Sequence, residues 1–190
     1  MRILIGLVMV LLFSSCASFS DRVIRQNKVS LKEKDLKKLE GRYELFPDIS
    51  YDKKGKSQTI KSDEAARNNL NAFVKSRECR YDYSEKYFVD VKILKDNRIQ
   101  FIAKKDSVNV DGVVVGFKLK KGLFYLDNKY LQRNGIPYIA GGYTNHKTRI
   151  GLAKDNGLLV NFAYDNSGAI MFMLAAGSSY NLGYHFKRIQ

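Results

Sequence analysis

From residue 86 onward, apolar and polar residues alternate with a period of two, which predicts half-buried β-strands. Tyr87, Val89, Val91 and Ile93 would share one face of the first of these strands, opposite Asp90 and Lys92. Comparable segments follow at 98–104, 113–120, 123–126, 144–154, 158–164, 169–175 and 184–189. An earlier alternating segment, Gly41 to Phe46, ends at Pro47 and predicts a first strand.

Turn-forming sequences separate these segments. Asn156-Gly157 is the strongest two-residue hairpin signal in the chain. Further turns are predicted at 95–97, 121–122, Asn134-Gly135, Gly141-Gly142 and Asp165-Asn166-Ser167-Gly168. Eight or nine strands joined by short turns predict a mainly β chain, an antiparallel meander that forms either a barrel or, alternatively, a β-sandwich.

Two stretches before the strands have helical patterns. Residues 62–77 are predicted to form one amphipathic helix, because Ser62 suits an N-cap and Leu70, Phe73 and Val74 share a face. A short helix over residues 30–40 is predicted from the Ser30 and Glu33 capping-box pattern. The polar stretch at 48–61 is predicted to be a loop.

The amino-terminal sequence predicts export. Met1-Arg2 precedes an apolar run, Ile3 to Phe13, as in a secretory signal peptide, and the run is shorter than the roughly 20 residues of a membrane-spanning helix. Phe13-Ser14-Ser15-Cys16 resembles the lipobox of bacterial lipoproteins, with Phe13 where that family usually has Leu. The resemblance implies cleavage by signal peptidase II before Cys16 and acylation of Cys16. The alternative is an ordinary secreted protein cut nearby, for instance after Ala17.

These features predict a signal peptide at 1–15, a tether at 16–29 and one β-rich domain at 30–190. The resemblance implies a membrane partner through acylated Cys16, and Ala17, with no acidic residue beside it, favours the outer membrane of the bacterial cell envelope. The chain holds 33 Lys and Arg against 19 Asp and Glu. An exported chain rarely meets nucleic acid, so this charge indicates anionic lipid or lipopolysaccharide as a partner, or simply a soluble surface.

The ends of the β-rich domain resemble those of the lipocalin and fatty-acid-binding-protein group. Gly41-Arg42-Tyr43 opens the first predicted strand and Lys187-Arg188 closes the last, with Tyr43 where that group has Trp. The resemblance implies a lipocalin-like barrel in which Tyr43 and Arg188 form a closing pair. Inward side chains of the late strands, Phe162, Tyr164, Ile170 and Phe172, would line a cavity for an apolar small ligand, unless they form an ordinary packed core.

The sequence predicts no enzyme, metal or cofactor. Ser50-Tyr51-Asp52-Lys53 resembles the Ser-x-x-Lys motif of penicillin-binding enzymes, but it lies in a predicted loop and Lys147-Thr148-Arg149 departs from their Lys-Thr-Gly. His146 and His185 are too few for a zinc site. Cys79, beside Arg77 and Arg80, is either a buried free thiol or a reactive one, and an intermolecular disulfide stays open.

Two functions follow from these observations. The first is a membrane-anchored lipoprotein whose barrel binds an apolar or amphiphilic small ligand. The alternative is a structural or interaction lipoprotein with a filled core, which acts through its basic surface. An enclosed apolar cavity of roughly 300 Å3 or more would favour the first function.

Overall fold

The computed structural model describes residues 18–136, 140–170 and 174–189, with side chains described outside 134–136, 140–141, 169–170 and 174–176. The predicted signal peptide, Cys16 and Phe172 lie outside the described residues. Among the helices of the described part, none is long and apolar enough to cross a membrane.

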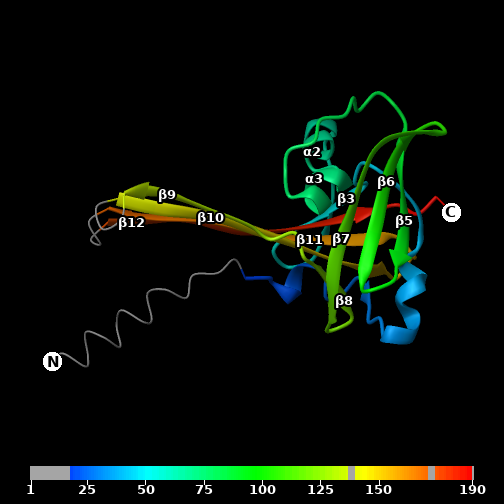
Figure 1. Cartoon of the computed structure of the whole chain (residues 1–190), viewed down its shortest axis with the longest axis horizontal. Helices are drawn as coiled ribbons and strands as arrows, with labels where there is room; N and C mark the ends of the chain where they lie inside the picture. Colours follow the sequence, from blue (N-terminus) through cyan, green and yellow to red (C-terminus); the bar gives the residue numbers. More distant parts are fainter. Residues whose placement is uncertain (1–17, 137–139, 171–173, 190) are drawn as a thin grey trace.

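The described chain is mainly β, as predicted, with neighbouring strands antiparallel (Figure 1). The strand order is β2-β5-β6-β7-β8-β10-β11-β12-β3-β4, with β1 and β9 each paired to β10. Twelve strands are present among the described residues rather than eight or nine, because short strands form in segments that were predicted as tether or loop. Their bounds are β1 Lys28–Val29, β2 Gly41–Glu44, β3 Ile49–Tyr51, β4 Ser57–Thr59, β5 Tyr87–Leu94, β6 Arg98–Lys105, β7 Val108–Lys120, β8 Leu123–Leu126, β9 Tyr130–Ile136, β10 Ala140–Ala153, β11 Leu158–Ile170 and β12 Leu174–Phe186.

The sheet has a body and a long projecting arm (Figure 1). The arm is four strands wide and comprises residues 130–136, 140–146, 164–170 and 174–180, from β9, β10, β11 and β12. The predicted turns at Asn134-Gly135, Gly141-Gly142 and Asp165 to Gly168 were wrong, because these residues pair within the strands. Residues 177–180 are all exposed, so water reaches both faces of the arm and the apolar alternation that marks a buried strand is missing there.

The predicted helix at 62–77 is interrupted. It forms two short helices, α2 Ser62–Arg67 and α3 Leu70–Lys75, and the break lies at Asn68 and Asn69. The Asn69 side chain accepts a hydrogen bond from the Ala72 amide at 3.0 Å and donates to the Cys79 carbonyl at 2.7 Å. A side chain that satisfies a helix start in this way favours a new N-cap over a continued helix.

The predicted helix at 30–40 is a 3-10 helix, η2 Glu33–Leu39, and a shorter one, η1 Asp21–Val23, precedes it. The predicted alternation in β5 and β6 is confirmed, since Val89, Val91, Ile99, Phe101 and Ala103 are buried. These side chains pack with α3 and with β8, β10, β11 and β12 in one core cluster. The interior is filled by large side chains, among them Tyr43, Phe101, Phe124 and Phe186.

Among the described strands, pairing does not close the sheet into a barrel. The first strand, β2, meets the chain just after β12 at an isolated antiparallel bridge between Tyr43 and Arg188. The Glu44 amide donates to the Lys187 carbonyl at 2.9 Å. The Arg188 guanidinium carbon lies 5.2 Å from the centroid of the Tyr43 ring, and the Tyr43 hydroxyl donates to the Leu39 carbonyl at 2.8 Å. Burial raises the pKa of Tyr43 to about 12, so this ring is neutral at neutral pH.

The contact between Tyr43 and Arg188 should contribute a measurable coupling energy. Replacing Tyr43 with Leu keeps an apolar side chain but removes the ring face, and Arg188→Ala removes the cation. We expect the double variant to be more stable than the sum of the single effects predicts, by roughly 0.5–2 kcal/mol. Urea unfolding of all four proteins would measure this, and additive effects would show that the ring and the cation are not coupled.

Candidate functional site

Residues 18–29, the described part of the predicted tether, are folded onto the body. Val23 and Ile24 are buried and pack with Leu123. β1 pairs with the body end of β10, with Lys28 opposite Ala153. The Phe19 ring lies edge-on to Tyr125 with 5.3 Å between ring centroids. The segment that directly follows the predicted lipidation site is therefore held by the sheet.

Arg149 holds this segment in place. It is 1% exposed and lies in β10, where charged side chains are rarely buried without partners. Its guanidinium donates to the Asp21 carboxylate at 2.7 Å, to the Ser20 carbonyl at 3.1 Å, to the Tyr125 hydroxyl at 2.9 Å and to the Asn161 amide oxygen at 2.9 Å. The hydrogen bond from Arg149 is the main cause that lowers the pKa of Asp21. The ion pair thus joins the amino-terminal segment to three strands.

A second set of contacts lies at the very start of the described chain. The Asn181 side chain accepts from the Ser20 amide at 2.8 Å and donates to the Ser18 carbonyl at 2.9 Å. Ser18 is only two residues after Cys16. The first described residues of the chain are therefore fixed to β12.

Basic side chains gather around this segment. The basic cluster consists of Arg25, Lys28, Lys121 and Arg149, with Asp21 among them. The Lys28 ammonium donates to the Lys121 carbonyl at 2.6 Å, and the Lys121 ammonium lies 3.4 Å from the Asp21 carboxylate. Burial and the nearby charges of Arg149, Lys121 and Arg25 lower the pKa of Lys28. Four cations around one carboxylate leave a net positive charge, which favours an anionic partner.

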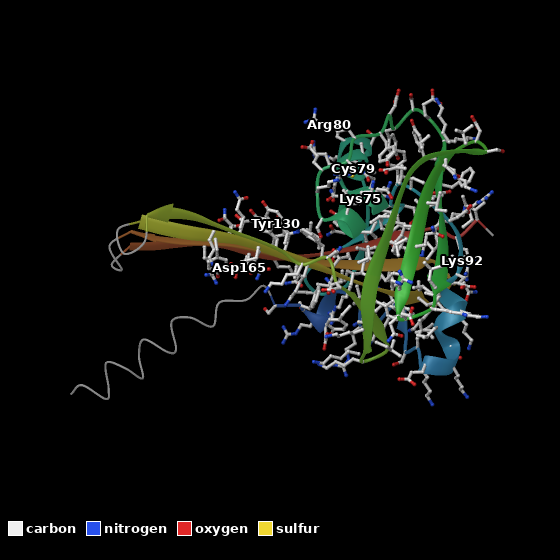
Figure 2. All side chains as sticks on the ribbon, viewed as in Figure 1. Lys75, Cys79, Arg80, Lys92, Tyr130 and Asp165 are labelled. Carbon is white, nitrogen blue, oxygen red and sulfur yellow. The ribbon has the colours of Figure 1, made fainter. Side chains whose placement is uncertain are left out.

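An aromatic ladder crosses the arm, and its first member, Tyr130, is labelled in Figure 2. The ladder has one residue on each of the four strands, and each lies opposite the next. These are Tyr130 on β9, His146 on β10, Tyr164 on β11 and Tyr180 on β12. The rings are stacked, with interplanar angles of 16–20° and centroid distances of 4.7, 6.4 and 4.6 Å along the row. Burial lowers the pKa of His146, which favours its neutral imidazole. On the opposite face, the Asp165 carboxylate accepts hydrogen bonds from Tyr143 and Ser167.

The structure does not gather the predicted cavity residues around one hollow. The Phe162 ring packs against Phe73 and His146, with centroid distances of 5.4 and 5.3 Å. Tyr164 belongs to the aromatic ladder. The backbone of Ile170 pairs with Ala140 and Leu174 at the far end of the arm, roughly 20 Å along β11 from Tyr164. Phe172 lies outside the described residues.

A polar hollow of about 380 Å3 lies beside α3, where Figure 2 labels Lys75, Cys79 and Arg80. Its lining comprises Arg77, Glu78, Cys79, Arg80, Tyr81, Val110 and Asp111. Arg80 pairs with Glu78 at 2.8 Å, and Lys75 pairs with Asp111. Burial raises the pKa of the Cys79 thiol, which favours the unreactive form over a thiolate. The hollow therefore offers no activated nucleophile.

The remaining candidate residues lie apart from one another. Ser50 is in β3, between Gln58 and Tyr184, and not at a helix start. His185 lies between the carboxylates of Asp48 and Asp155, at 2.6 and 3.1 Å. Burial alone would lower the pKa of His185, but these carboxylates outweigh it and raise the pKa. Within the described residues, no group of His, Cys, Asp and Glu could hold a metal ion.

Breaking the ion pair of Arg149 should release the amino-terminal segment. Asp21→Asn removes the carboxylate charge and leaves a buried guanidinium partly unpaired, so we expect a loss of roughly 1.5–3 kcal/mol in unfolding free energy. Limited proteolysis should then cut within residues 18–25 faster than in the parent chain. Asp106→Asn, a substitution at an exposed position of the β6–β7 turn, is the matched control. Equal cleavage rates in Asp21→Asn and the parent would contradict this role.

No family model, curated protein or solved structure matches the chain. Any inference about function therefore rests on the residues and contacts described above.

Proposed function

We propose that this protein is a lipid-anchored protein of the bacterial cell envelope that lies close against its membrane and serves as an interaction protein. In this proposal Cys16 carries the acyl chains and is anchored in the outer membrane. The exposed members of the basic cluster, Arg25 and Lys121, face anionic lipid. The observation that carries the proposal is the docking of residues 18–25 onto the body by Arg149, directly beside the basic cluster.

The distance from anchor to body supports this arrangement. Ser18 and Ser20 are fixed by Asn181, so Ala17 alone would separate an acylated Cys16 from the folded body. Such a short link would keep the folded body near the lipid head groups, where charges within about one Debye length, roughly 10 Å, are attracted. Each Lys or Arg near an anionic surface contributes about 1 kcal/mol of attraction. The basic cluster and the anchor would then bind the same membrane together.

The filled interior supports the interaction function over the ligand-binding one. The rings of Phe73, Phe162 and Tyr184 are in contact in the region where a cavity was predicted. Tyr43, Phe101 and Phe186 are also fully buried. We further propose that the body has a lipocalin-like architecture. In it, Tyr43 and Arg188 form the pair that joins the two ends of the sheet. Binding of an apolar small ligand stays the second hypothesis.

Anchoring can be tested at Cys16. Cys16→Ala should prevent acylation, so the protein should move from the membrane fraction to an unprocessed or soluble form. A single acyl chain binds membranes only marginally, whereas the two or more that lipoproteins carry anchor stably. Mass spectrometry of the amino terminus of the parent protein should find an acylated cysteine. A mature chain that begins elsewhere, without an acyl mass, would falsify the anchor.

The role of the basic cluster can be tested with the unacylated chain from residue 17 onward. It should sediment with vesicles that contain anionic phospholipid, and the bound fraction should fall as salt is raised, because exposed charges are screened. Arg25→Glu with Lys121→Glu should reduce binding at least several-fold. The control is Arg80→Glu with Lys86→Glu, since Arg80 lies beside α2 and α3, away from the amino-terminal segment (Figure 2).

Three comparisons separate the sources of negative charge. Vesicles of neutral phospholipid should bind little, vesicles with lipopolysaccharide report on that lipid, and free inorganic phosphate tests whether an isolated anion competes. Equal binding to neutral and anionic vesicles would show that the basic cluster only maintains solubility. Equal losses in both charge-reversal pairs would show that overall charge, and not this cluster, attracts the membrane.

A further inference from the structure

The aromatic ladder of the arm ends in an exposed ring on each side. Tyr130, at the β9 edge, is 39% exposed, and Tyr180, at the β12 edge, is 38% exposed. Leu131, the next residue on β9, is 45% exposed. Each terminal ring therefore stacks on a neighbour on one side only, and its other side lies at the edge of the arm.

Both edges of the arm are open to further strand pairing. Within the described residues, β9 pairs with β10 alone, and the outer edge of β12 is joined only by β3, at Gly183 to His185. From Asn166 to Tyr184 the sequence has no Lys, Arg, Asp or Glu, although 27% of the chain is charged. Soluble proteins protect exposed edge strands with charges, proline or bulges, and an edge without them readily pairs with another strand.

The direction of the strands determines which edges can meet. β9 and β11 run outward along the arm, and β10 and β12 run back toward the body. When two copies lie side by side with their arms pointing the same way, β12 of one copy is antiparallel to β9 of the next. Because the arm has an even number of strands, this contact continues the antiparallel order without interruption.

We propose that the arms of several copies of this chain pair edge to edge, with β12 of one copy adding to β9 of the next. In this register Tyr180 stacks on Tyr130 of the neighbouring copy, so the aromatic ladder continues from arm to arm. Ser179 then lies opposite Leu131 of the neighbour. A second copy fits better than an unrelated strand, because it brings an aromatic ring at the required level and an uncharged ladder. The contact is head-to-tail, so repetition gives a ring or an open row.

Cysteine cross-linking of the full chain tests this proposal. With Cys79 replaced by Ser, the variant Leu131→Cys with Ser179→Cys places one thiol on each edge of the arm. The two thiols of one chain are separated by the width of the four-stranded arm, beyond the roughly 7 Å limit between the Cα atoms of a disulfide, so they can bridge only between copies. Mild oxidation in cells should shift most of the protein to dimers and larger species on a non-reducing gel.

Controls distinguish this contact from others. Leu131→Cys alone and Ser179→Cys alone should stay monomeric, as should Leu131→Cys combined with Lys92→Cys, since Lys92 is an exposed residue of the body. Adding Tyr180→Lys to the double-cysteine variant should reduce cross-linking at least five-fold, while Lys92→Glu should leave it unchanged. A monomeric double-cysteine variant would overturn the proposal. Dimers from Ser179→Cys alone would also overturn it, because they indicate a two-fold contact between β12 strands. An unacylated Cys16 would supply a third thiol, so the cross-linking is repeated with Cys16→Ala, which leaves both edges of the arm unchanged.

Discussion

The buried guanidinium of Arg149 is the interaction on which the arrangement of this protein depends. An ion removed from water costs several kcal/mol unless charges and hydrogen bonds replace the lost solvent. Two of its four partners, Ser20 and Asp21, belong to the amino-terminal segment, and the others lie on β8 and β11. Docking of that segment is therefore part of the fold itself, since an undocked segment would leave a buried cation half satisfied.

The strands of the body were predictable because each has one face in the core. In β5, β6 and β7, burial of alternate residues such as Val89, Phe101 and Phe117 produces the period of two that the sequence displays. The break between α2 and α3 also has a signal, since two consecutive asparagines favour a cap over a helix interior. The apolar face with Leu70, Phe73 and Val74 was predicted correctly, but it was assigned to one helix over 62–77, whereas α3 spans only Leu70–Lys75.

Sequence patterns could predict neither the strands of the arm nor the burial of Arg149. Strands with water on both faces need no apolar alternation, so Gly141-Gly142 and Asp165 to Gly168 look like turns although they lie in β10 and β11. An arginine in a polar strand is ordinarily exposed. Its partner, Asp21, is 128 residues away in a stretch that resembles a linker. Tyr43 and Arg188 were singled out only through a family resemblance, because one aromatic and one basic residue form no pattern of their own.

The docking of the amino-terminal segment also constrains the order in which the chain can fold. Ser20 meets its partners 129 and 161 residues later, at Arg149 and Asn181. Synthesis proceeds from the amino end, so residues 18–25 have no surface to bind until almost the entire chain exists. Contacts between such distant residues also form slowly. Any enzyme or export machinery that acts on the amino end during synthesis therefore meets an undocked segment, and the contacts of Ser20 with Arg149 and Asn181 form only after the last strand is in place.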